Sequence, residues 1–149
     1  MMTSLTRIAA IGLLLTASLS MAQTPYTEDS TYRGLGGKEG IDQIVAAFIP
    51  LIQADVRINE SFKDTDMKQL KQRLAEQLCE FSGGPCKYTG KYKDRDMESA
   101  HADLKISNAQ FNAIAEDLQL AMERHAVPSH VQNKLLAKLA PMQRAIVTR

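Results

Sequence analysis

Apolar residues recur at helical spacing in four long segments of this 149-residue chain. The segments are 38–54, 66–81, 107–122 and 129–146, and each carries one apolar stripe typical of a helix packed on one face. None of them shows the alternation of polar and apolar residues that is expected of a strand. We therefore predict an all-α fold with four substantial helices and some short turns.

Polar pairs typical of a capping box precede three of these stripes. The pairs are Asp66 with Gln69, Ser107 with Gln110, and Ser129 with Gln132. Pro50 lies inside the first stripe, where it removes a backbone donor and is expected to kink or loosen the last turns. The Gly-rich stretch 34–40 follows no strand and has Glu39 where a phosphate loop needs Ser or Thr, so we expect a turn before a helix.

The first 22 residues have the layout of a cleaved secretory signal. Arg7 is followed by an apolar run from Ile8, and small residues occur at Ser20 and Ala22. The run is shorter than the roughly 20 residues that a membrane-spanning helix needs. We expect an exported, periplasmic protein without stable membrane insertion, in which residues 23–31 form a flexible lead-in and residues 32–149 a single domain.

The charge balance argues against a nucleic-acid partner. The formal net charge is +1, and it falls to about 0 when the segment containing Arg7 is removed. Segment 87–95 interleaves Lys and Tyr, a composition that can bind single-stranded nucleic acid, but in a nearly neutral protein we expect a solvated loop. Cys79 and Cys86 can form a disulfide in an oxidising compartment, worth about 2.5 kcal/mol for so short a loop, or remain two free thiols.

One histidine lies on an apolar stripe. Met97, His101 and Leu104 are four and three residues apart, so they share one face of a helical turn. Such a histidine can pack in a core, or it can be the single imidazole that holds haem iron among apolar walls. Local chemistry does not decide between the two. Neither His125 nor His130 has an acidic, Ser or Cys neighbour at a spacing that indicates a nucleophilic site.

The ordered motifs resemble those of the group 1 truncated haemoglobins. They are "LGGKEGIDQIVAAF" (35–48), "DVRINESF" (55–62), "MKQLKQRLAEQLCEFSGGPCKYTG" (67–90), "DMESAH" (96–101) and "AVP" (126–128), and the resemblance spans 32–147. It implies a two-over-two helical sandwich around haem b, the non-covalent iron protoporphyrin IX. His101 then matches the proximal iron ligand, Phe62 stacks on the porphyrin, and Met97 packs beneath it. The remaining expected haem contacts are Phe48, Ile49, Leu70, Arg73, Leu74, Ile106 and Phe111.

The distal side departs from the family. Ile49 stands where many relatives place a tyrosine that hydrogen-bonds the gas ligand, and Leu70 and Leu74 make the facing positions apolar. A missing donor should speed oxygen release and favour less polar ligands. Gln77, one turn beyond Leu74, is either a substitute donor or a solvent-facing residue.

The haem rim is also expected to differ. Segment 91–95, "KYKDR", makes the connection before the proximal turn longer than in compact relatives. Lys68, Lys71 and Arg73 lie on the helix that would pass the haem edge, where each can pair with a propionate or remain solvated.

We therefore expect an exported haem protein that reversibly binds a diatomic gas, oxygen before NO or CO. The alternative is a haem redox enzyme, such as a nitric oxide dioxygenase or a peroxidase-like protein. It would need a separate electron-donor protein, because the chain has no flavin or nicotinamide fingerprint. A third hypothesis is a haem-free helical interaction module in which His101 only packs.

Overall fold

The computed structural model describes residues 29–149, which are helical apart from connections and one isolated β-bridge between Tyr92 and Arg95. The α-helices are α1 (Asp29–Gly34), α2 (Gly37–Ala54), α3 (Met67–Phe81), α4 (Met97–His101), α5 (Asn108–Arg124), α6 (Ser129–Leu139) and α7 (Gln143–Ile146). Short 3-10 turns cover η1 (Asn59–Phe62), η2 (Ala102–Leu104) and η3 (Ala140–Met142). The predicted all-α class is confirmed.

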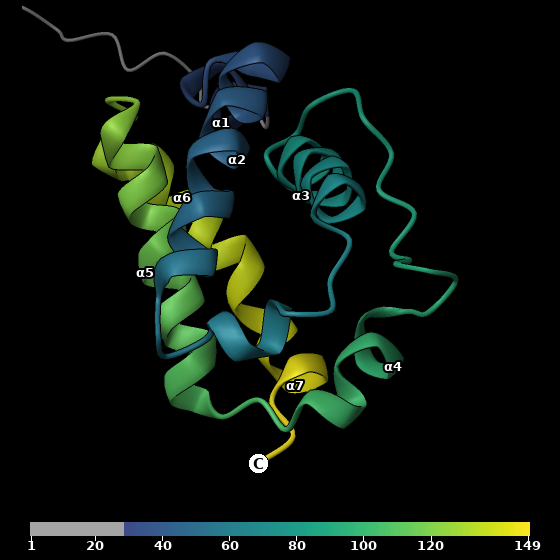
Figure 1. Ribbon diagram of the computed structural model, residues 1–149. Coiled ribbons are helices and arrows are strands. Elements are labelled where there is room, and N and C mark those ends of the chain that lie inside the picture. The colour runs from purple at the N-terminus through teal and green to yellow at the C-terminus, as the bar shows by residue number, and fades with distance from the viewer. Residues whose placement is uncertain (1–28) are drawn as a thin grey trace, which may run out of the picture.

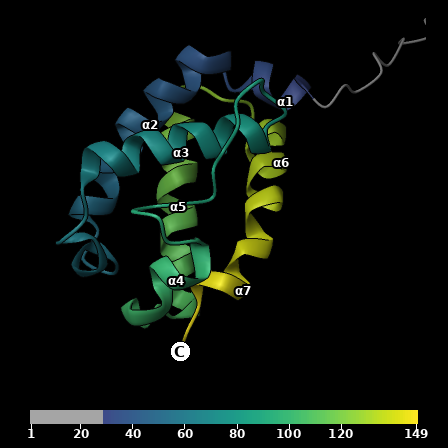
Figure 2. The ribbon, with the colours of Figure 1, turned by 90° about the vertical axis from the view of Figure 1, so that its right-hand side faces the viewer.

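Helix α2 lies at the centre of the packing and contacts both α3 and α5 (Figure 1). Its predicted stripe is buried and forms the middle of the core, with members Ile41, Ile44, Val45, Phe48 and Ile52. In the view of Figure 2, α3 crosses in front of α5, and α4 lies below it at the end of the long connection 82–96. One long connection therefore joins the end of α3 to the start of α4.

The flexible lead-in was expected to reach residue 31, but residues 29–31 are helical and belong to α1. Thr31 is buried, and the Tyr32 backbone N–H donates to the Ser82 carbonyl at 3.0 Å. Gly34 allows α1 to approach α6, since a Cβ there would lie 2.6 Å from a methyl carbon of Val131. The expected signal segment and the rest of the lead-in lie outside the described residues. No helix within 29–149 is long and apolar enough to cross a membrane.

The capping predictions have mixed outcomes. The box at Ser107 and Gln110 is confirmed, with both reciprocal bonds present. The box at Ser129 is wrong, because Ser129 is already the first residue of α6 and Pro128 precedes it without a side-chain cap. Gln132 instead donates its amide to the Val127 carbonyl at 2.8 Å, which ties α6 to the preceding turn.

At Asp66 the box is only half formed. The Asp66 carboxylate accepts from the Gln69 backbone N–H at 3.0 Å, as predicted. The Asp66 backbone N–H, however, donates to the Tyr92 hydroxyl at 2.9 Å, and Gln69 Oε1 is buried without a partner. A side chain from a distant segment has thus replaced the local partner.

Two prolines have different effects on helix length. Helix α2 continues through Pro50 to Ala54. The last predicted helix is instead divided, because Pro141 lies in the 3-10 turn η3 and α7 begins only after it. A proline cannot donate the backbone hydrogen bond that would continue α6.

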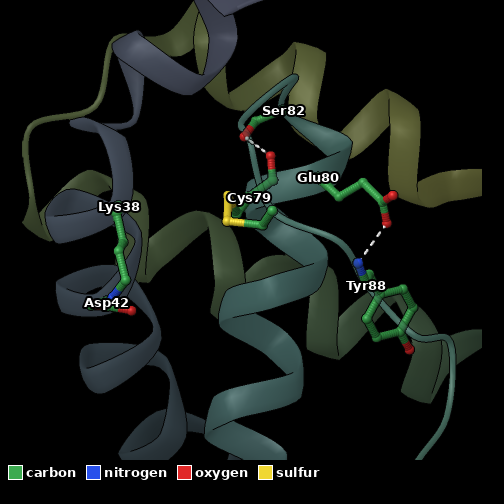
Figure 3. The surroundings of a disulfide bond; sticks show 7 residues. Lys38, Asp42, Cys79, Glu80, Ser82 and Tyr88 are labelled. Carbon is green, nitrogen blue, oxygen red and sulfur yellow. Dashed lines mark hydrogen bonds and ion pairs between the residues drawn. A yellow bond between two sulfur atoms is a disulfide. The ribbon is translucent and has the colours of Figure 1, made fainter.

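Cys79 and Cys86 form a disulfide with a Cα–Cα distance of 5.7 Å, so the free-thiol alternative is wrong (Figure 3). Cys79 is buried in the core, and its carbonyl accepts from the Ser82 hydroxyl at 2.9 Å. Gly84 leaves room here, since a Cβ would lie 2.7 Å from Cys79 Sγ. The bridge therefore pins the start of the long connection to the end of α3.

Candidate cofactor site

A cavity of about 410 Å³ opens between α3 and α4 and reaches the core beneath α2. Most of the expected haem contacts line it, namely Phe48, Phe62, Leu70, Arg73, Leu74, Met97, His101 and Phe111. The helices bring these residues together from far apart in the chain. The site is therefore a product of the tertiary fold, and no local motif contains it.

Two expected contacts do not line the cavity. Helix α2 contributes Phe48 and Ile52, which are four residues apart and share one face. Ile49 points to a neighbouring sector of the helix and packs against the core cluster, while Ile106 is buried outside the lining. The structure thus does not support Ile49 and Ile106 as cofactor contacts.

His101 is half-buried at the last turn of α4, and its ring is oriented by a single backbone contact. The Nδ1 atom lies 2.6 Å from the Met97 carbonyl oxygen, one turn earlier. A carbonyl only accepts, so Nδ1 carries the proton and donates it. With the proton on Nδ1, a metal can be bound through the lone pair of Nε2, which is the usual arrangement of a ligating histidine.

The walls of the cavity are mostly apolar. Leu70, Leu74 and Leu78 of α3 line one side, and Met97 and Leu104 lie on the side of His101. A flat apolar cofactor could be enclosed between these two groups.

Gln77 is one of two polar residues, with Arg73, that α3 contributes to the cavity lining. It lines the cavity and is only 6% exposed, so the solvent-facing alternative is wrong. Its Nε2 donates to Met142 Sδ at 3.3 Å. A primary amide has two N–H donors, so a second one remains for a ligand in the cavity.

Of the three basic residues expected near a haem edge, only Arg73 lines the cavity, while Lys68 and Lys71 are exposed outside the lining. Arg73 donates through Nη1 to Glu76 Oε2 at 2.6 Å, but its Nε is buried without a partner. The guanidinium therefore keeps donor capacity at the edge of the cavity.

Three side chains of segment 87–95 were missed as cavity residues by sequence reasoning, which took this segment for a solvated loop. Tyr88, Tyr92 and Arg95 all line the cavity. Burial raises the pKa of Tyr88, whose backbone N–H donates to Glu80 at 3.0 Å (Figure 3). The alternation of Tyr with Lys was the available signal, since rings can turn inwards while charges stay in water.

The residues present fit a haem. Within residues 29–149 no group of three or more His, Cys, Asp or Glu side chains could hold a metal ion. One imidazole with a free Nε2 suits iron whose other ligands come from a porphyrin. The apolar walls suit the ring, and the polar edge at Arg73, Tyr92 and Arg95 suits its carboxylates.

Comparison with known proteins also identifies this chain as a globin. The sequence pattern of the family described as "Bacterial-like globin" matches residues 30–148. The group 1 truncated hemoglobin GlbN of Mycolicibacterium paratuberculosis is 30% identical over 119 residues, which cover 80% of this chain and 85% of the relative. The group 1 truncated hemoglobin of Tetrahymena pyriformis is 32% identical over 103 residues, covering 69% of this chain and 82% of the relative.

Solved structures agree with the sequences. The Fe(III) form of truncated hemoglobin from Tetrahymena pyriformis superposes with a TM-score of 0.73 at 28% identity, covering 80% of this chain and 98% of that one. The 2/2 hemoglobin of Synechococcus sp. PCC 7002 gives a TM-score of 0.71 at 28% identity, covering 80% and 99% of the two chains. The predicted two-over-two globin fold is thereby confirmed. This chain belongs to the bacterial-like globin family and is a haem-binding group 1 truncated haemoglobin.

Proposed function

We propose that this chain is an exported globin that reversibly binds oxygen at the iron of haem b, with His101 as the protein ligand. The haem supplies the metal that coordinates a diatomic gas. The chain encloses it, excludes water from it and presents one oriented imidazole. Oxygen is the gas ligand that we propose, and NO and CO would compete with it for the iron.

The observation that carries this proposal is the orientation of His101 inside an apolar cavity. Its Nδ1 is held 2.6 Å from the Met97 carbonyl, in the tautomer that leaves Nε2 to a metal. The same side chain lines the cavity together with Met97 and Leu104. A histidine that only packs would have no need of a cavity of about 410 Å³ beside it.

The opposite wall supports a ligand-binding role for the other side of the haem. Leu70, Leu74 and Phe48 form an apolar surface there, and Gln77 contributes an amide. An apolar surface of this kind keeps water away from a small bound molecule, and the amide of Gln77 is the donor that we assign to stabilise it. We therefore expect weaker discrimination in favour of oxygen than a tyrosine-bearing pocket would give.

Export is proposed from the first 22 residues, and the disulfide supports it. Bridges such as Cys79–Cys86 persist in oxidising compartments and are rare in the cytosol. A fractionation of the native host with an antibody against the chain tests this part separately. A cytosolic, uncleaved chain would refute it.

The test of the iron ligand is an absorption spectrum of the His101→Ala variant loaded with haem. The parent protein should show a globin-like Soret band in its ferric, ferrous and CO-bound forms, and the variant should lose the normal band position. Added imidazole should restore much of it by filling the space left by the side chain. His125→Ala is the matched control, because His125 is exposed and lies outside the cavity lining. An unchanged spectrum in His101→Ala would overturn the assignment.

A further inference from the structure

The end of the long connection forms a tight hairpin at the edge of the cavity. The Tyr92 backbone N–H donates to the Arg95 carbonyl at 2.8 Å, and the Arg95 N–H donates back to Tyr92 at 3.0 Å. Between them Lys93 and Asp94 have φ values of 50° and 60°, as in a two-residue hairpin turn with left-handed central residues. Both paired residues, Tyr92 and Arg95, line the cavity.

The hairpin is fixed to both helices that flank the cavity. On the α3 side, the Tyr92 hydroxyl oxygen accepts from the Asp66 backbone N–H at 2.9 Å. On the α4 side, the Arg95 guanidinium donates to the Ser99 carbonyl and lies 3.7 Å from the Asp103 carboxylate. The hairpin thus forms a strap from the start of α3 to α4, across the edge of the site.

The Tyr92 contact replaces a bond that α3 could make by itself. Gln69 is placed to bond the Asp66 backbone N–H in a capping box, yet its Oε1 is buried without a partner because Tyr92 takes that donor. A buried unpaired acceptor costs free energy. The position of the Tyr92 hydroxyl is therefore maintained at a local cost, which is consistent with a use for it at the cavity.

The chemistry of a phenol identifies that use. A hydroxyl has one donor and two acceptor sites, and the bond from Asp66 occupies an acceptor site. The O–H proton of Tyr92 is left for a partner in the cavity that Tyr92 lines, beside the positive charge of Arg95. A donor next to a guanidinium recognises an anionic oxygen.

We propose that the strap closes over the haem edge and that Tyr92 donates its hydroxyl proton to a haem carboxylate, with Arg95 beside it. This proposal rests on haem binding by the same cavity. It makes Tyr92 a cofactor-positioning residue, which slows loss of the haem and does not touch the gas ligand.

The experiment compares two pigments in two proteins. The full chain and its Tyr92→Phe variant are each loaded with haem or with haem dimethyl ester, in which both carboxylates are blocked. Transfer of pigment to an excess of haem-free myoglobin is then followed by absorbance. We expect Tyr92→Phe to lose haem about tenfold faster, as for one hydrogen bond to a charged acceptor, and to lose the ester at the parent rate. Tyr32→Phe is the matched control, because Tyr32 lies outside the cavity lining.

Amide exchange on the haem-free proteins tests the α3 contact without the cofactor. Tyr92→Phe should speed exchange at Asp66, and Tyr32→Phe should not. The proposal is overturned if haem loss is unchanged in Tyr92→Phe, or if haem and the ester are lost equally faster. A parent protein that takes up neither pigment would instead refute the function proposed above, and this assignment with it.

Discussion

Replacing Gln77 by Leu tests whether this amide donates a hydrogen bond to the gas ligand. Gln77 is 6% exposed, lines the cavity and faces Met142 with one of its two N–H groups. Leucine has a similar volume, so the change removes the amide with little repacking. A thioether is a weak acceptor, so leaving Met142 without its partner should cost little stability.

The size of the effect follows from the environment of the amide. A donor in a dry cavity contributes roughly 1 to 3 kcal/mol to a polarised ligand, which corresponds to about 5- to 150-fold in a rate or affinity. Oxygen becomes more negative than CO when it binds a ferrous haem. Removing the donor should therefore weaken oxygen binding more than CO binding. We expect oxygen dissociation to accelerate within that range in Gln77→Leu, while CO dissociation changes little.

Stopped-flow displacement of oxygen by CO measures this rate directly. Gln72→Leu is the matched control, because Gln72 is an exposed glutamine on the same helix and lies outside the cavity lining. Leu74→Gln adds an amide to the same wall and should slow oxygen release. An oxygen dissociation rate in Gln77→Leu equal to that of the parent would remove Gln77 from the ligand site and refute the reasoning.

Two further predictions concern stability. Cys79→Ala with Cys86→Ala should lower the free energy of unfolding by about 2 to 4 kcal/mol, from lost loop closure together with lost packing of the buried Cys79, as measured by urea unfolding. An equal stability of the two proteins would contradict this. Burial raises the pKa of Asp117, helped by the charge of Asp55, so the folded state holds that proton more tightly than the unfolded chain. This contribution to stability is present at low pH and is lost as pH rises above the ordinary carboxyl value of about 3.9. Asp117→Asn should therefore gain stability relative to the parent between about pH 4 and pH 7, and a constant difference would refute the assignment.

The spacing of apolar residues predicted the long helices because this spacing can be read from a short stretch of the sequence. The five apolar positions of α2 are all buried, as expected. The same logic failed for the last helix, where a stripe running to Ile146 hid the break at Pro141. A stripe shows which face is buried, whereas a proline decides whether the backbone can continue.

The site was only partly predictable, because its geometry depends on which sector of each helix faces the cavity. Phe48 and Ile49 are adjacent in sequence, yet only Phe48 lines the cavity, since neighbouring residues on a helix point about 100° apart. The alternation of Tyr with Lys indicated that rings of this segment could turn inwards, but it did not show where Tyr88 and Tyr92 would lie. Their segment is irregular, and its path depends on the disulfide at one end and the bond to Asp66 at the other.

The group that accepts the hydrogen bond from His101 Nδ1 affects how much electron density the imidazole could donate to a bound iron. It is a neutral peptide carbonyl, that of Met97, and not a carboxylate. A carboxylate would draw the ring proton away and give the imidazole some of the character of an anion, whereas a carbonyl leaves it neutral. A neutral ligand pushes little electron density towards the iron, and a strong push is what favours cleavage of an O–O bond. If haem iron is bound at Nε2 of His101, the Met97 carbonyl would therefore favour release of the gas ligand unchanged over cleavage of its O–O bond.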